Sequence, residues 1–183
     1  MPLAPTVLTS ADRGALYDEA VASWGKAIVR LARSYELDAH KREDLLQDIH
    51  LALWRSLALF DGACSLRTWV YRVAHNAAAS HVIRDRRHAA KNFTTLDALD
   101  NSGARHHAVD GEHAATQNLL LDHVMTLVQR LNPIDRQVVL LYLEGLDAAE
   151  IGEVTGHSAG NVATKVHRIK KILGRQIAAG GVK

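Results

Sequence analysis

Six polar side chains near the end of the chain recur at helical spacing and have the chemistry needed to bind DNA. They are Asn161, Thr164, Lys165, Arg168, Lys171 and Arg175. The first three lie toward the N-terminal end of the predicted helix, where side chains of this length and polarity can reach base edges in a major groove. The three that follow are cationic and could neutralise phosphates.

The other side of the same predicted helix is apolar. Val162, Val166, Ile169 and Leu173 return every three or four residues, which predicts a stripe packed against a core. An amphipathic helix with an ordinary solvated face would show the same periodicity, so this alternative stays open. No acidic residue follows Glu153, and this favours a polyanionic partner.

A short element must precede this helix and set its angle. Asp147 followed by Glu150 predicts a reciprocal capping box that starts a helix. Gly156 is predicted to end that helix in the left-handed conformation, and Ser158 is predicted to cap the next one and to join its DNA-contacting face. Gly152 sits where a side chain would obstruct two closely crossing helices. Together these signals predict a helix-turn-helix.

The distribution of charge is more informative than its sum. The net charge is only +2, which does not by itself indicate a nucleic-acid partner. Acidic residues crowd one stretch, from Glu36 to Asp48, and basic residues crowd another, from Arg84 to Lys91. One acidic and two basic surfaces predict two kinds of partner, although each cluster alone could be a solvated helix face.

The apolar periodicity divides the chain into two units. Three helical segments are predicted at roughly 12–34, 41–60 and 66–86, within a first domain spanning 10–87. Residues 88–118 lose the periodicity and are interpreted as a flexible linker. A four-helix domain is predicted over 119–178. Aromatic residues are few and Pro occurs three times, so the predicted fold class is all-α, with two small helical domains.

Other chemistries find no support in the sequence. The eleven histidines are scattered and form no zinc-binding spacing, and the chain has no nucleophile elbow or phosphate-binding glycine loop. No cofactor, metal site or enzymatic activity is therefore expected, apart from a weak metal site at His106, His107 and His113. Cys64 cannot form an internal disulfide, and no secretory signal or membrane-spanning run is recognisable. These features predict a cytoplasmic protein without membrane insertion.

The C-terminal unit contains a series of motifs in a fixed order, namely Leu131-Asn132-Pro133, Arg136, Glu144-Gly145-Leu146, Ala149-Glu150-Ile151-Gly152 and His167-Arg168-Ile169-Lys170. With these motifs the unit resembles the fourth conserved region of bacterial sigma factors, particularly the extracytoplasmic-function group. One departure is that Val162-Ala163-Thr164-Lys165 stands where the family often has Val-Lys-Ser-Arg. The resemblance implies that this unit reads duplex −35 DNA. Because of this departure, it does not imply the same promoter preference.

The N-terminal unit resembles the second conserved region of the same group. The matching stretches are Asp44 to Ile49, Leu53 to Leu57, Phe60-Asp61-Gly62 and Leu66 to Asn76. Two separate motifs in the right order are more specific than either alone. The resemblance implies that the chain binds core RNA polymerase, through the clamp helices of the largest subunit and the flap of the second-largest. It also implies restraint by an anti-sigma factor, which could hold the chain at the membrane.

The acidic predicted helix supplies the expected polymerase contacts. Its apolar stripe is Leu45, Leu46, Ile49, Leu53 and Leu57. An exposed leucine beside carboxylates and a glutamine suits a basic partner helix. The predicted polymerase-binding residues are Asp44, Leu45, Gln47, Asp48 and Leu51.

The third predicted helix and the loop before it supply the expected −10 contacts, because a melted promoter needs new stacking, pockets and phosphate contacts. The small residues of the loop would permit a flipped base to approach closely, as the resemblance implies. The predicted −10 residues are Asp61, Gly62, Ala63, Cys64, Ser65, Arg72, Asn76, Ser80, Arg84, Arg86 and Arg87, with Ile83 on the same stripe and Val70, Val73, Ala74 and Ala77 opposite. Trp54 and Trp69 are interpreted as core aromatics.

Two alternatives stay open. A conventional helix-turn-helix repressor or activator would use its N-terminal half to dimerise or bind a ligand, and would bind an operator without polymerase. An interaction protein that captures a sigma partner or polymerase would not read DNA, and would tolerate alanine at Lys165 and Arg168.

Overall fold

The computed structural model describes residues 10–86, 128, 129 and 131–180, and within them every regular element is a helix. The chain divides into two compact units, Met1–Ala90 and Lys91–Lys183. The predicted linker, 88–118, lies outside the described residues. No described helix has the length and apolar character needed to cross a lipid bilayer.

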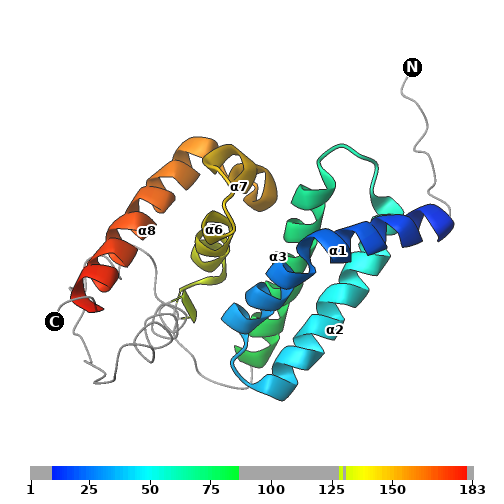
Figure 1. Cartoon of the computed structure of the whole chain (residues 1–183), viewed down its shortest axis with the longest axis horizontal. Helices are drawn as coiled ribbons and strands as arrows, with labels where there is room; N and C mark the ends of the chain where they lie inside the picture. Colours follow the sequence, from blue (N-terminus) through cyan, green and yellow to red (C-terminus); the bar gives the residue numbers. More distant parts are fainter. Residues whose placement is uncertain (1–9, 87–127, 130, 181–183) are drawn as a thin grey trace. The chain divides into compact units, whose positions relative to one another are not determined.

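In the described part of the first unit, the helices gather into one cluster (Figure 1). It contains α1 (Ser10–Tyr35), α2 (Ala39–Ser56), a 3₁₀ turn η1 (Leu57–Leu59) and α3 (Leu66–Arg86). The side chain of Asp38 caps α2 by accepting a hydrogen bond from the backbone N–H of Lys41. The three predicted segments are confirmed, with the difference that the second ends in the 3₁₀ turn.

The three helices of this unit pack against one another around an apolar core. Helix α2 and η1 contribute a stripe at helical spacing, as the sequence predicts, although Leu46 is only half-buried. The buried apolar residues are Ala20, Ala27, Ile28, Leu31, Ala32 and Tyr35 of α1; Leu45, Ile49, Leu53 and Leu57 of α2 and η1; and Val70, Tyr71, Ala74 and Ala78 of α3.

One histidine belongs to this core. His75 is 2 % exposed, and its Nδ1 lies 3.3 Å from the hydroxyl of Tyr35, within hydrogen-bond reach. Burial lowers the pKa of His75 from 6.5 to about 3, because the charged imidazolium would lose its hydration. The imidazole is therefore neutral in the folded protein at neutral pH.

The stability of the first unit is expected to fall as the pH drops below 6.5. Unfolded His75 takes up a proton near pH 6.5 and folded His75 only near pH 3, so the unfolded state binds more protons in this window. The stabilisation is complete above pH 6.5, and its loss amounts to at most about 1.4 kcal/mol per pH unit. Urea unfolding at several pH values measures this slope.

A His75→Gln variant is the control for this pH dependence. His50 also has a lowered pKa because of its partial burial, so only the difference between the variant and the wild-type chain reports on His75. The variant is expected to show a shallower loss of stability on acidification. Equal slopes for the two proteins would contradict the assignment.

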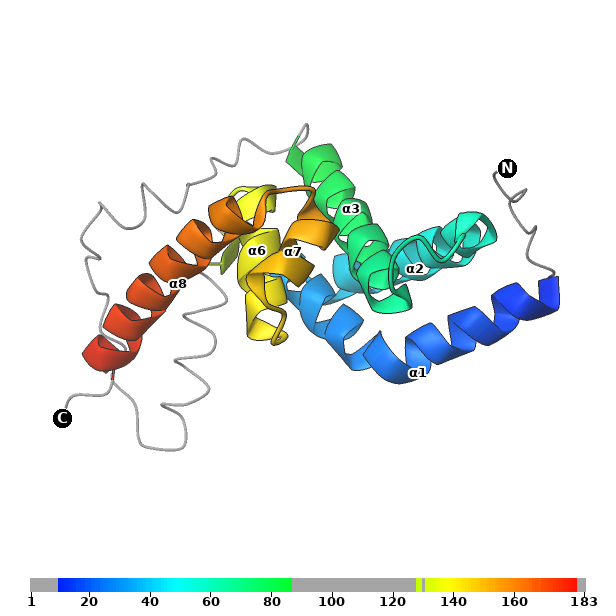
Figure 2. The same cartoon turned by 90° about the horizontal axis from the view of Figure 1, so that it is seen from above.

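The second unit contains α6 (Pro133–Leu143), α7 (Ala148–Thr155) and α8 (Ala159–Gly180), which pack against one another. Figure 2 shows α7 leading into the long helix α8. The side chain of Asn132 caps α6, and Pro133 occupies its first turn, where a missing N–H costs nothing. Of the additional helix predicted near residues 119–131, only residues 128 and 129 are described as helical.

Candidate nucleic-acid interface

The turn between α7 and α8 has the predicted cap and turn chemistry. Asp147 accepts hydrogen bonds from the N–H groups of Ala149 and Glu150, and Glu150 accepts one from the N–H of Asp147 at 2.8 Å. Gly156 has a φ of 75° and ends α7 in the left-handed conformation. The Oγ of Ser158 accepts a hydrogen bond from the N–H of Asn161 at 3.3 Å. The predicted helix-turn-helix geometry is confirmed.

Gly152 is the point of closest approach in this motif. A Cβ atom at this position would lie 2.7 Å from the backbone carbonyl oxygen of His157, which belongs to the turn rather than to a flexible side chain. Gly152 is itself buried in α7. The prediction that a side chain at Gly152 would be obstructed is confirmed. The obstacle is the backbone of the turn and not, as predicted, a second helix.

A Gly152→Ala variant is expected to lose about 1–3 kcal/mol of stability, because the added methyl group forces the turn open. This occurs although alanine normally gains about 1 kcal/mol over glycine inside a helix. Gly174→Ala, in α8, is the matched control, since nothing lies within 4 Å of a Cβ built there. Urea unfolding should show a gain for the control and a loss for Gly152→Ala. Stabilisation by both would contradict the steric argument.

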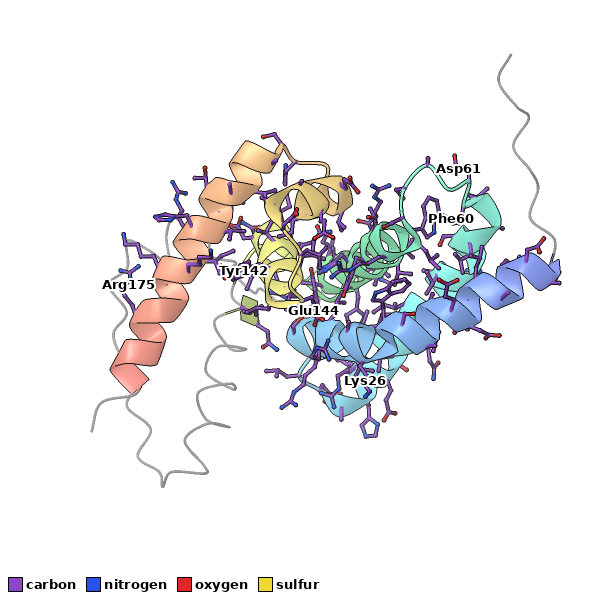
Figure 3. The ribbon with its side chains drawn as sticks, turned by 45° about the horizontal axis from the view of Figure 1, so that its top comes forward. Lys26, Phe60, Asp61, Tyr142, Glu144 and Arg175 are labelled. Carbon is purple, nitrogen blue, oxygen red and sulfur yellow. The ribbon has the colours of Figure 1, made fainter. Side chains whose placement is uncertain are left out.

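Helix α8 presents most of its predicted DNA-contacting residues to solvent. Val162, Ile169 and Ile172 form its buried side. The exposed members of the predicted set are Ser158, Asn161, Thr164, Lys171 and Arg175. Arg168 is half-buried. Figure 3 shows Arg175 projecting from α8.

The outward face of α8 also carries a residue that the sequence prediction missed. His167 is exposed and lies three residues after Thr164 and four before Lys171, so the three side chains share one face. The sequence prediction did not include Ile172 in the buried stripe of this helix. Ile172 is 5 % exposed, so the buried stripe includes a residue that was not predicted. Val166, predicted as core, is only half-buried.

Two lysines of α8 are directed toward α6. Lys165 forms an ion pair with Asp135, whose side chain is 3 % exposed. The ammonium group of Lys170 lies 5.5 Å from the ring centroid of Tyr142, a cation–π distance. Lys165 was predicted to reach base edges, and its observed position instead joins two helices of the unit.

Arg136 supports the start of α6 from inside the unit. It is 2 % exposed, and its guanidinium donates hydrogen bonds to the carbonyl oxygens of Val128, Gln129 and Leu131. These carbonyls belong to the segment that leads into α6. A planar group with several donors in a fixed fork can satisfy all three acceptors at once.

The acidic face of α2 is open to solvent. Asp44, Gln47 and Asp48 are exposed, and Leu51 is 45 % exposed beside them. Leu45 was included among the predicted polymerase contacts, and this assignment is wrong, because its side chain is fully buried in the core of the unit. We define the α2 face as Asp44, Gln47, Asp48 and Leu51.

The loop between η1 and α3 combines exposed small residues with a packed aromatic base (Figure 3). Gly62 has a φ of 76°, and Asp61 accepts a hydrogen bond from the N–H of Ala63. The rings of Phe60 and Trp69 meet edge to face at 5.4 Å. Of the predicted loop contacts, Asp61, Gly62, Ala63 and Ser65 are exposed, and Cys64 is half-buried.

The aromatic residues of this unit are held by specific partners. The indole Nε1 of Trp69 donates to the Oγ of Ser56 at 3.0 Å. Trp54 meets Tyr17 edge to face at 5.5 Å, and the guanidinium of Arg13 lies 4.3 Å from its ring centroid. Both tryptophans are half-buried rather than fully enclosed.

The outer stripe of α3 continues from the loop. Asn76, Ser80, Ile83 and Arg84 are exposed and Arg72 is half-buried. Opposite them, Val70 and Ala74 are buried, whereas Val73 and Ala77 are only half-buried. The side chains of the predicted −10 residues Arg86 and Arg87 lie outside the described part.

An ion pair connects α3 to the α2 face. Arg84 donates to a carboxylate oxygen of Asp48 at 2.8 Å, and both side chains are about half-exposed or more. The outer stripe of α3 and the α2 face therefore adjoin each other in the first unit. A surface pair of this kind contributes little to stability, about 0–1 kcal/mol.

A metal site has no support in the part of the chain that the structure describes. Histidine, cysteine and carboxylate side chains form no cluster of three or more there. The weak site predicted at His106, His107 and His113 falls outside the described residues.

Two family models match this chain, one on each unit. The model described as Sigma-70 region 2 matches residues 20–88. The model described as Sigma-70, region 4 matches residues 121–173. Together they include α2, α3, α6 and α7 in full, and most of α1 and α8.

Several sigma factors are similar to this chain over most of their own length. The RNA polymerase sigma-H factor of Pseudomonas aeruginosa is 25 % identical over 88 % of this chain and 86 % of its own. The ECF RNA polymerase sigma factor SigW of Bacillus subtilis is 24 % identical, over 76 % of this chain and 77 % of its own. A solved structure of CnrH, in complex with the cytosolic domain of CnrY, aligns with a TM-score of 0.59 and 24 % identity. It covers 93 % of this chain and 99 % of the solved one, and shows a shared fold.

Proposed function

Because the chain belongs to the extracytoplasmic-function group of the sigma-70 family, we propose that it binds core RNA polymerase and directs initiation at specific promoters. The observation that carries this proposal is the pairing of a region 2 unit with a region 4 unit in one chain. Catalysis of RNA synthesis belongs to the polymerase in this account.

The region 4 unit reads the duplex −35 element in this proposal. Its first support is a capped helix-turn-helix whose second helix exposes Asn161, Thr164, His167 and Lys171. Its second support is that no acidic residue follows Glu153 in the sequence, so this helix carries no negative side chain. A major groove admits such a helix, and cationic side chains along it offset phosphate charge. The flap of the second-largest polymerase subunit holds this unit in place.

The region 2 unit docks on polymerase and opens the −10 element in this proposal. The α2 face offers carboxylates around an exposed leucine, which complements a basic helix such as a clamp helix of the largest subunit. The adjoining outer stripe of α3 and the loop 61–65 take up the separated strand, with exposed polar side chains for phosphates and bases.

An anti-sigma protein restrains the free factor in this proposal. Its support is the similar fold of CnrH, which was solved with the cytosolic domain of CnrY. A cytoplasmic location follows from the need to reach polymerase and promoter DNA, and an anti-sigma protein in the membrane would hold the factor there until released.

A mobility-shift experiment with genomic fragments tests the proposal against a conventional repressor. Neither the chain nor core polymerase alone should select a fragment, whereas the two together should retain a specific subset. The physical reason is that polymerase fixes the spacing of the two units, which makes the second DNA contact effectively intramolecular. Tight, selective binding by the chain without polymerase would contradict the proposal and favour a repressor or activator.

A Thr164→Glu variant is expected to weaken retention of the selected fragments by about 10- to 50-fold, because it places a carboxylate on the exposed face of α8 against phosphates and base edges. Ala22→Glu adds the same charge on the exposed side of α1 and is the matched control. Its retention should equal that of the wild-type complex. Equal retention by the Thr164→Glu complex would support an interaction protein that does not read DNA.

A further inference from the structure

Lys165 lies on the recognition helix α8, but its ammonium group is directed inward. It donates to Oδ1 of Asp135, and the two side chains are 24 % and 3 % exposed. Oδ2 of the same carboxylate accepts a hydrogen bond from Nδ2 of Asn132 at 3.0 Å. Asn132 in turn caps α6 by accepting from the N–H of Asp135 at 2.8 Å. Lys165 therefore connects α8 to the capped first turn of α6.

The position of Lys165 on α8 agrees with this inward direction. Val162 and Ile169, three residues before it and four after it, are 0 % and 1 % exposed. Thr164 and His167, its neighbours on the opposite side, are exposed. A carboxylate buried as deeply as that of Asp135 is tolerated only when it is paired and hydrogen-bonded. Any rotation of α8 that carried Lys165 toward solvent would break that pair.

We propose that Lys165 is a positioning residue for promoter reading and does not itself contact DNA. Through Asp135 it fixes the rotation of α8 about its own axis relative to α6, and this rotation determines which side chains face the groove. The inference rests on the proposed function, because it assigns a role within the reading of DNA by α8.

Salt dependence of DNA binding separates positioning from direct contact. Each neutralised phosphate contributes about 0.9 to the slope of log affinity against log salt concentration for duplex DNA. The experiment measures this slope for the full chain on a short duplex of random sequence, together with the melting temperature followed by circular dichroism. The variants are Lys165→Met, the double variant Asp135→Asn with Lys165→Met, and Lys171→Met as a matched lysine on the exposed face of α8.

Lys165→Met alone is expected to lower the melting temperature by about 10 °C or more, because it leaves a buried carboxylate without its cation. The double variant removes both charges and should recover at least half of that loss, with a salt slope equal to that of the wild-type chain. It keeps the test valid even if the single variant does not fold. Lys171→Met should reduce the slope by about 0.9.

A second measurement detects a change that lost stability alone would not cause. In complex with core polymerase, the double variant should select different bases from a library randomised over the −35 element, whereas Lys165→Arg, which can still pair with Asp135, should keep the wild-type preference. An unchanged preference in the double variant would overturn the positioning role. So would a reduced salt slope in the double variant, which would make Lys165 a phosphate contact. Failure of the wild-type chain, in complex with core polymerase, to select any bases from the −35 library would instead overturn the proposed function and this inference with it.

Discussion

Replacement of Arg136 by methionine is expected to unfold the second unit in a large fraction of molecules. The guanidinium donates to three carbonyl oxygens in the segment leading into α6, and methionine fills a similar length without any donor. Buried acceptors left without a partner cost about 1–3 kcal/mol each. For three acceptors the expected loss is about 3–9 kcal/mol, which is comparable with the whole stability of many small domains.

Urea unfolding of the full chain measures this effect. Gln137→Met, at the half-buried neighbouring position on α6, is the matched control and should move the transition of the second unit only slightly. The Arg136→Met chain should also fail to retain promoter fragments with core polymerase, although its first unit is intact. A transition at the same urea concentration as in the wild-type chain would show that Arg136 is not the anchor of this segment.

A Leu51→Arg variant is expected to lose core polymerase binding by about 100-fold or more. Leu51 is the exposed apolar residue of the α2 face, and the buried core of an interface is more apolar than its rim. Arginine removes the apolar contact and places a positive charge against a partner that we propose to be basic. A 100-fold loss corresponds to about 2.8 kcal/mol of binding free energy.

Val29→Arg is the matched control for this interface. Val29 is 50 % exposed on α1, so the same substitution is made at an equally exposed apolar residue outside the α2 face. Equilibrium titration of labelled chain with core polymerase should give wild-type affinity for the control. Equal losses for both variants would indicate a general effect of added charge, and no loss for Leu51→Arg would remove the α2 face from the polymerase interface.

Local signals could be predicted from the sequence because they depend on neighbouring residues. The capping box of Asp147 and Glu150, the left-handed Gly156 and the cap at Ser158 each involve backbone groups two to four residues away. Such contacts form in the same way wherever the pattern occurs. The succession of helices followed similarly from the apolar spacing.

Contacts between distant residues could not be predicted in this way. Asp135 and Lys165 are 30 residues apart, and no local pattern indicates that a lysine at the reading end of a helix would face inward. The buried His75 lies within hydrogen-bond reach of Tyr35, which is 40 residues away on another helix. A buried polar residue cannot be recognised from apolar periodicity, because it occupies a position on the buried side of a helix without being apolar itself.

The sequence predicted the buried sides of α2 and α8 only approximately. Leu45 satisfied both the apolar stripe of α2 and the family motif, and only the structure shows that it belongs wholly to the core. On α8, Val166 was predicted to be buried but is only half-buried, whereas the buried Ile172 was left out of the predicted stripe and the exposed His167 was left out of the predicted outer face. An error of one residue rotates the inferred face by about 100°, since a helix has about 3.6 residues per turn.

Run-off transcription with purified core polymerase tests the central claim most directly. The measurement compares transcripts from genomic fragments with core polymerase alone, with the chain added, and with the Leu51→Arg chain added. Our account predicts discrete transcripts that begin at defined positions only when the wild-type chain is present. Transcript patterns that are identical with and without the chain, on every fragment, would contradict it.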